Sequence, residues 1–275
     1  MAAAFLITLR EGLEAALIVG IIAAYLVKIG RRDTLSTVLI GVAAAIGLSV
    51  AAGVAIVLTI GRLPILVQEG IEGIAGLIAV AVLTWMLFWM RRAGRALKGQ
   101  LEHGVDLALS QGSSRAIVGL AFVAVIREGL ELVLFTLAII TSAGVGPATL
   151  LGAVLGLAGA IGLGWAIFVG GRRVDLRRFF TITGAVLIFV AAGLVAFSIH
   201  AFGEAGIIVN GGSTFDIGSV LPESSPIGTV LAALFGYRSA PTPLELIGYL
   251  AYLIPTLTIF VLDGRWPVRR TPAKA

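Results

Sequence analysis

The feature that most constrains this fold is a series of apolar stretches, each long enough to cross the roughly 30 Å hydrocarbon layer of a membrane. Hydrophobic residues make up 59% of the 275 residues and charged residues only 13%, a composition outside the range of soluble domains. Because lipid offers the backbone no hydrogen-bond partner, spans of this kind are helices. We predict an all-α integral membrane protein with seven transmembrane helices, at residues 4–27, 35–60, 65–90, 116–142, 148–170, 179–202 and 244–262.

The distribution of basic residues predicts which connections face the cytoplasm. Most of the 20 Lys and Arg residues fall after the first helix, between the third and fourth, after the fifth, and in the C-terminal tail. The positive-inside rule therefore places the N-terminus outside and the C-terminus in the cytoplasm, with the protein in the cytoplasmic (inner) membrane. Trp85, Phe88 and Trp89, followed by Arg91 and Arg92, look like an aromatic belt at the inner surface.

Charged residues inside the predicted spans are the second strong constraint. The sequence Arg-Glu-Gly-Leu-Glu occurs at residues 10–14 and again at residues 127–131. A charge near the bilayer centre costs roughly 2.5 to 3.5 kcal/mol, so such residues need partners and mark functional sites by default. In each copy the two glutamates are three residues apart and share a helix face, and the arginine can reach the second glutamate. The carboxylates are Glu11, Glu14, Glu128 and Glu131, and the countercharges are Arg10 and Arg127.

The two copies of the motif lie on predicted helices that run in opposite directions through the membrane. This indicates an inverted repeat, in which a pseudo-two-fold axis relates the first three helices to the next three and the seventh is left over. Transporters with this symmetry bind their substrate near the bilayer midplane, at the repeat interface. The predicted single transmembrane domain comprises repeat one (1–90), a cytoplasmic amphipathic connector (91–115), repeat two (116–202), an extracytoplasmic acidic loop (203–243), helix seven (244–262) and a basic tail (263–275).

The paired motifs predict a site for a multivalent hard cation. Four carboxylates against two guanidinium groups leave a formal charge of two minus. Carboxylate oxygen selects ions such as Mg²⁺, Mn²⁺ or ferric iron over soft metals, and helix bundles build metal sites from similar pairs of glutamates. The sequence has no Cys and only two His, which excludes a thiolate site. The structural alternative is that each arginine neutralises its own helix and the clusters only hold helices together.

Further acidic residues are candidates on the outer side of the membrane. Glu69, at the start of the third helix, could be a further ligand or a relay near the entrance, whereas Glu72 could simply hydrogen-bond to a neighbour. The outer loop carries several acidic residues against a single Arg238, and we expect them to gather cations near the entrance. These residues are Glu204, Asp216 and Glu223.

Three other features of the outer region are expected to be structural. The apolar stretch at residues 227–236 is too short to span a membrane, and we expect it to cap the bundle rather than enter it as a half-helix. His200 is expected to be hydrogen-bonded at a helix end. Glu245 is expected to favour the N-terminus of the seventh helix electrostatically.

Several functions lack support in the sequence. No Lys stands in the glycine-rich setting of a phosphate-binding loop, and no His-Glu-x-x-His occurs. The basic clusters lie between apolar runs and are therefore topology signals rather than a nucleic-acid surface. The membrane potential supplies about 2.3 kcal/mol per charge per 100 mV, so cation uptake needs no nucleotide motor. We expect no catalytic residues and no permanently bound cofactor.

Around its two motifs the sequence resembles the high-affinity iron permease family, the oxidase-dependent iron transporters, and in particular the bacterial ferrous-iron (Efe-type) branch. The resemblance extends over essentially the whole chain and implies a seven-helix iron permease whose motif glutamates carry the metal. A His expected in relatives before the Glu-Ala-Gly segment is replaced here by Gly203, so Glu204 would act without it. The segments that carry the resemblance are residues 9–17, 69–70, 83–92, 125–132, 189–193, 204–206 and 234–255.

The resemblance also implies a partner. The family typically works beside an extracytoplasmic oxidase, peroxidase or iron-binding protein, which the acidic loop could face, and a homo-oligomer is left open. Two other functions remain open: a membrane enzyme that oxidises iron at the same carboxylates without moving it, and a permease for manganese, magnesium or lead. The sequence decides neither between ferrous and ferric iron nor on counter-transport of protons.

Overall fold

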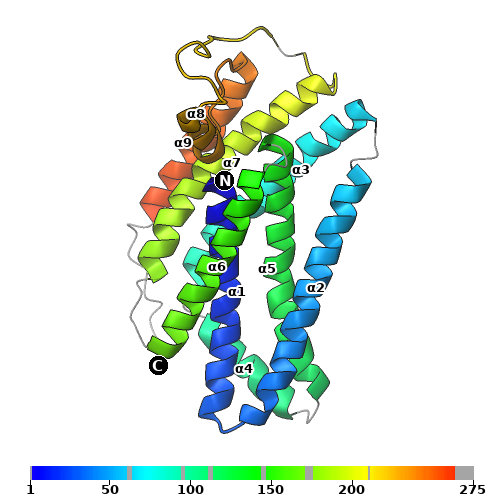
Figure 1. Ribbon diagram of the computed structural model, residues 1–275. Helices are drawn as coiled ribbons and strands as arrows, with labels where there is room; N and C mark the ends of the chain where they lie inside the picture. The colour runs from blue at the N-terminus through cyan, green and yellow to red at the C-terminus, as the bar shows by residue number, and fades with distance from the viewer. Residues whose placement is uncertain are drawn as a thin grey trace, which may run out of the picture.

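The computed structural model of the chain describes all residues except 1, 61–63, 94–96, 111–113, 144–146, 171–175, 210 and 264–275. The described residues form helices and connecting loops, with no strand among them (Figure 1). The elements are α1 (Ala2–Lys28), the short 3-10 helix η1 (Arg32–Thr34), α2 (Leu35–Ile60), α3 (Ile65–Ala93), α4 (Leu97–Ser110), α5 (Ser114–Ala143), α6 (Pro147–Gly170), α7 (Leu176–Glu204), α8 (Pro226–Phe235) and α9 (Pro243–Asp263).

Five described helices are long and apolar enough to cross a membrane, namely α2, α3, α6, α7 and α9. Two more, α1 and α5, have 27 and 30 residues, but each carries the three charges of one Arg-Glu-Gly-Leu-Glu motif. Large apolar side chains on α2, such as Leu39 and Val54, are exposed, as expected for a lipid-facing helix. The all-α prediction is confirmed, and each predicted span corresponds to one long helix.

The long helices pack as pairs. α1 lies mainly against α6, α2 against α5, and α3 against α7, while α9 covers α7. α1 and α5 also contact each other in the middle of the bundle and run in opposite directions, since α1 ends and α5 begins near α4 (Figure 1). The two motif-bearing helices therefore meet, and each has its main partner among the helices of the other predicted repeat.

The glycine inside each motif sits where two helices come close. A Cβ atom on Gly12 would lie 2.8 Å from Cβ of Ala160 on α6, and one on Gly129 would lie 2.9 Å from Cβ of Ser49 on α2. Small residues allow transmembrane helices to approach in this way. The motif glycines thus fix the distance between α1 and α6 and between α5 and α2.

Buried apolar residues form separate layers toward the two ends of α1 and α5. Ile7 and Phe135 belong to a cluster that α1, α3, α5 and α7 share near the start of α1. Ile22 and Ala121 belong to a second cluster near the other end, which α2 and α4 complete. We call these two clusters the outer and inner apolar layers, after the predicted orientation of the chain in the membrane. The charged motifs lie between them along the helices.

The two short helices occupy opposite ends of the bundle. α4 buries Leu101 and Val105 against the inner apolar layer and leaves His103 and Asp106 exposed, which is the amphipathic arrangement expected from the sequence. The hydroxyl of Tyr25 on α1 donates to Oδ1 of Asp106 at 2.7 Å. α4 is therefore fastened to the end of α1.

α8 lies beside the N-terminus of the chain at the other end (Figure 1). Ser225 caps it by accepting a hydrogen bond from the Gly228 amide, and Gly236 ends it with φ of 64°, a backbone conformation that favours glycine. A Cβ on Gly193 of α7 would lie 2.6 Å from the Cα of Gly236. The end of α8 therefore packs backbone to backbone against α7.

Candidate metal site

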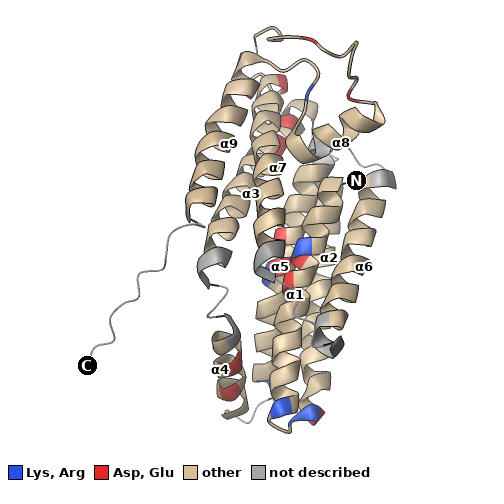
Figure 2. Ribbon diagram, turned by 90° about the vertical axis from the view of Figure 1, so that its left-hand side faces the viewer, with Lys and Arg blue, Asp and Glu red and all other residues tan. Residues whose placement is uncertain are grey.

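Three glutamates from α1 and α5 converge midway along these helices. One carboxylate oxygen each from Glu11, Glu128 and Glu131 lies within 4.8 Å of the other two, and all three residues are buried. Figure 2 shows acidic and basic positions close together near α1 and α5, in a part of the bundle that otherwise carries little charge. We call these three residues the carboxylate cluster.

Each motif arginine is paired with the second glutamate of its own motif. Nε of Arg10 donates to Oε1 of Glu14 at 3.0 Å, and Nε of Arg127 donates to Oε1 of Glu131 at 3.0 Å. The i, i+4 spacing on a helix produces this pairing directly. Arg127 also lies 3.9 Å from Oε1 of Glu128, so its charge is shared between two residues of the cluster.

Several oxygen atoms of the carboxylate cluster are buried without a hydrogen-bond partner among the described residues. They are Oε1 and Oε2 of Glu11, Oε2 of Glu128 and Oε2 of Glu131. A buried polar atom without a partner is costly, and a charged one more so. Because the three carboxylates converge on one place, a single bound cation or a set of protons could satisfy these oxygens together. Hard divalent cations prefer this type of ligand.

The structural alternative raised by the sequence describes only part of the arrangement. Arg10 and Glu14 form a buried pair, with exposed fractions of 1% and 6% for their side chains, and Glu14 stands outside the carboxylate cluster. Nη1 of Arg10 has no hydrogen-bond partner among the described residues. Glu11 has no comparable pairing, and the described hydrogen bonds of Glu131 use only one of its oxygens. The structure thus brings together three of the four predicted glutamates and holds the fourth beside them on its arginine.

Arg127 has aromatic neighbours that the sequence did not reveal. Its Cζ lies 4.4 Å from the ring centre of Trp89 and 5.2 Å from that of Trp85. The two indoles, four residues apart on α3, stack on each other with centroids 5.9 Å apart and planes 23° apart. The i, i+4 spacing of the tryptophans predicts that they share a helix face. No sequence signal connects that face to α5.

The candidate residues on α3 differ in their contacts. Glu72 is buried and accepts a hydrogen bond from Nε2 of Gln68 at 2.8 Å, so it has the neighbouring partner that the sequence allowed for. Glu69 is half-buried and lies within electrostatic reach of Glu204 and His200 on α7. Glu69 therefore lies near Glu204 and His200 and is separate from the carboxylate cluster.

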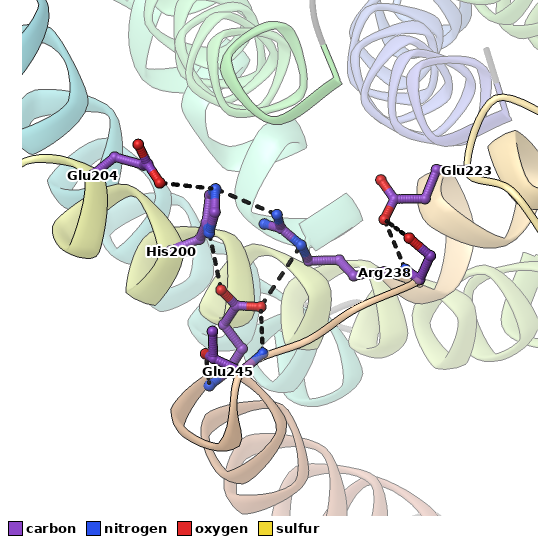
Figure 3. A network of polar contacts seen from close by, with 7 residues as sticks. His200, Glu204, Glu223, Arg238 and Glu245 are labelled. Atoms are coloured by element: carbon purple, nitrogen blue, oxygen red, sulfur yellow. Dashed lines mark hydrogen bonds and ion pairs between the residues drawn. The ribbon is translucent and has the colours of Figure 1, made fainter. Parts of the chain in front are cut away.

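A polar network at the outer ends of α7 and α9 centres on Glu245 (Figure 3). Glu245 is 2% exposed, and its Oε1 lies 3.0 Å from Nδ1 of His200. Arg238 contacts both residues, with Nη2 3.3 Å from Nε2 of His200 and Nε 3.7 Å from Oε2 of Glu245. Because a guanidinium can only donate, Nε2 of His200 accepts, and the proton sits on Nδ1, which donates to Glu245. Glu245 thus does more than favour a helix N-terminus: it fastens the loop and α9 to α7.

The acidic residues of the outer loop are exposed and partly engaged in loop structure. Glu223 accepts hydrogen bonds from the amide and hydroxyl of Ser239, and Asp216 accepts one from the Gly218 amide. Glu204 is exposed and lies 4.0 Å from His200. Their expected role in gathering cations stays a prediction.

Comparisons with known proteins identify relatives over nearly the whole chain. The model of the iron permease FTR1 family matches residues 1–268. A ferrous iron permease EfeU of Escherichia coli O6:H1 is 46% identical over 265 residues, which is 95% of each chain. The EfeU of Yersinia pestis is 45% identical over 264 residues, covering 95% of this chain and 93% of that protein. No solved structure matches the chain.

Proposed function

The chain belongs to the iron permease FTR1 family, and we propose that it imports ferrous iron across the cytoplasmic membrane by binding it at the carboxylate cluster. Glu11, Glu128 and Glu131 are the proposed ligands, with Glu14 as a fourth carboxylate beside them. The relatives are named ferrous iron permeases. Their names favour transport of iron over an enzymatic reaction on it.

The observation that carries this proposal is the convergence, inside the bundle, of three carboxylates that each have an unpartnered oxygen. The carboxylates come from two helices, and these oxygens have no hydrogen-bond partner among the described residues. Three carboxylates and the nearby Arg127 leave a formal charge of two minus, while Glu14 is neutralised by Arg10. A divalent cation would balance this charge, which favours Fe²⁺ over Fe³⁺.

We further propose seven membrane spans, formed by α1, α2, α3, α5, α6, α7 and α9, with the N-terminus outside and the C-terminus in the cytoplasm. In this arrangement α1 to α3 and α5 to α7 are inverted repeats. The helix pairing supports this arrangement. If α1, α2 and α3 are exchanged with α5, α6 and α7, the contact between α1 and α6 becomes the contact between α5 and α2. The same exchange leaves the contact between α1 and α5 and the contact between α3 and α7 unchanged, because the two helices of each pair replace each other.

Individual close contacts follow the same exchange. Gly12 faces Ala160 as Gly129 faces Ser49. One helical turn further along all four helices, Ala16 of α1 faces Gly164 of α6, and Val133 of α5 faces Gly53 of α2. These contacts therefore support the proposed pseudo-symmetry, beyond the repeated motif sequences.

Transport would proceed by alternating access at the carboxylate cluster. Apolar layers lie on both sides of the cluster, so we expect one layer to open at a time. In transporters built from inverted repeats, rocking of one repeat against the other provides such opening. Acidic residues of the outer loop and Glu69 would gather the ion before it enters. An extracytoplasmic oxidase, peroxidase or iron-binding partner would face that loop.

Uptake of radioactive Fe²⁺ into proteoliposomes with a negative internal potential tests the proposal. Replacing Glu11 and Glu128 together by glutamine should reduce uptake at least tenfold, because two of the three ligand carboxylates are lost. Asp33→Asn, an exposed acid on η1, is the control and should leave uptake unchanged. Uptake at the wild-type rate by the double variant would refute the site. Competition by Mn²⁺, Mg²⁺ and Pb²⁺ in the same assay identifies the preferred cargo.

A further inference from the structure

The two motif arginines, equivalent in sequence, have different surroundings. The side chain of Arg10 is 1% exposed and forms a buried ion pair with Glu14, outside the carboxylate cluster. The side chain of Arg127 is 34% exposed and contacts Glu131, which belongs to the cluster. Only Arg127 has a described contact with aromatic rings. The site is therefore asymmetric where the motifs are symmetric.

Arg127 uses different parts of its guanidinium for its two kinds of partner. Its Nε atom contacts Glu131 at 3.0 Å and Glu128 at 3.9 Å, while Cζ lies 4.4 Å from the Trp89 ring centre. A guanidinium forms hydrogen bonds at its edge and stacks through its face, so both contacts can exist together. The aromatic contact does not depend on the carboxylates and can persist when they have another partner.

Binding of an ion to the carboxylate cluster affects Arg127 directly. A divalent cation on the unpartnered Oε2 of Glu131 repels the guanidinium and weakens the attraction of Oε1, the oxygen that Nε contacts. If Arg127 had no other partner, it would lose its main stabilisation in largely apolar surroundings, and ion binding would be weakened by that cost. The indole faces provide a partner that the cation does not occupy, since cation–π attraction involves the ring and not the carboxylate.

We propose that Trp85 and Trp89 are positioning residues that hold Arg127 as an exchangeable countercharge. Arg127 pairs with Glu131 in the ion-free site and releases Glu131 to the incoming ion while its guanidinium stays on the indole rings. When the ion leaves, Arg127 pairs with Glu131 again. This inference rests on the proposed function of the cluster. Arg10 is not assigned this role, because its described partner is Glu14 and the described aromatic contacts belong to Arg127.

Anaerobic equilibrium dialysis of Fe²⁺ with the purified full chain in detergent tests this inference. Replacing Trp85 and Trp89 together by leucine should weaken Fe²⁺ binding about 2- to 30-fold, the range expected for loss of a cation–π contact. Trp165→Leu is the matched control, because this tryptophan is 67% exposed on α6 and should leave binding unchanged. Phenylalanine at both positions keeps an aromatic face and should give a smaller change than leucine.

A double-mutant cycle separates positioning from general structural damage. In an Arg127→Gln background no guanidinium is left to position, so the two leucine substitutions should change Fe²⁺ binding less than 2-fold. An equal loss in both backgrounds, or no loss beyond that of Trp165→Leu, would overturn the inference. If the double leucine variant does not fold, the double phenylalanine variant is measured in the same cycle in its place.

The outcome also distinguishes this inference from the function on which it rests. If Glu11→Gln with Glu128→Gln retains Fe²⁺ binding, the cluster is not the site and the proposed function fails. If those carboxylate variants lose binding while the tryptophan variants behave like Trp165→Leu, only the role of Trp85 and Trp89 is rejected.

Discussion

At the scale of single residues, Glu11 and Glu14 lie one helical turn apart on α1 yet have opposite surroundings. Both oxygens of Glu11 lack a hydrogen-bond partner among the described residues, whereas Glu14 accepts from Arg10. The spacing of the motif placed both on one face, but the rotation of α1 against α5 decides which of them faces the other helix. That rotation depends on tertiary packing, so the sequence could predict four candidate ligands but not the subset that converges.

This difference predicts opposite effects of the two glutamine substitutions on stability without metal. Glu14→Gln leaves Arg10 buried without its countercharge and should destabilise the protein by about 3 to 5 kcal/mol. Glu11→Gln removes one of three mutually repelling carboxylates and should leave the ion-free stability unchanged or raise it. Thermal unfolding of the purified protein in detergent measures both. A lower melting temperature for Glu11→Gln than for Glu14→Gln would contradict the assignment.

The Glu11→Gln variant should also differ from the wild type in its response to iron. A ligand that binds only the folded state stabilises it by RT ln(1 + L/Kd), where L is the free ligand concentration. Under anaerobic conditions Fe²⁺ should therefore raise the melting temperature of the wild-type protein, and Glu11→Gln should abolish most of that increase. Asp33→Asn should retain the full increase. A rise in Glu11→Gln as large as in the wild type would show that iron binds elsewhere.

At the scale of elements, the extents of the helices followed closely from the sequence, while their partners did not. Apolar length predicted a helix at 4–27, and α1 extends over Ala2–Lys28. Neither the pairing of α3 with α7 nor the contact of Trp89 with Arg127 could be predicted, because lipid-facing and partner-facing surfaces of a membrane helix are equally apolar. The extent of each helix depends on the local sequence, whereas the contacts between helices depend on tertiary packing.

Close packing of the motif glycines predicts a specific sensitivity to alanine. Gly129→Ala would place Cβ 2.9 Å from Cβ of Ser49, pushing α5 away from α2 and moving Glu128 and Glu131. Fe²⁺ uptake should fall at least tenfold. Gly119→Ala on the same helix meets nothing within 4 Å and should retain uptake with slightly higher stability. Adding Ser49→Gly should partly restore uptake in Gly129→Ala, and failure to do so would argue against this contact as the cause.

The loop network makes a prediction about the outer region. Arg238→Ala removes the residue that contacts both His200 and Glu245, so the loop between α7 and α9 should detach more readily. Limited proteolysis should then cleave residues 211–224 faster than in the wild type. Arg31→Ala, at an exposed position near η1, is the control. Equal cleavage rates in the two variants would show that the network does not hold the loop.

At the scale of the whole molecule, import of a divalent cation by the proposed mechanism should respond to membrane potential. Each positive charge moving inward gains about 2.3 kcal/mol per 100 mV, so Fe²⁺ gains about 4.6 kcal/mol. A potassium diffusion potential, negative inside, should raise Fe²⁺ accumulation in proteoliposomes over that at zero potential. Unchanged accumulation would indicate that other charges move in compensation and would contradict simple electrogenic uptake.

The two apolar layers around the carboxylate cluster limit the rate at which such a protein can transport ions. Opening one layer requires close-packed side chains such as Ile7 and Phe135, or Ile22 and Ala121, to separate, and collective motions of this kind take microseconds to milliseconds or longer. Each iron ion must wait for one such rearrangement. The molecule should therefore deliver ions singly and slowly compared with a channel, with a turnover that rises steeply on warming.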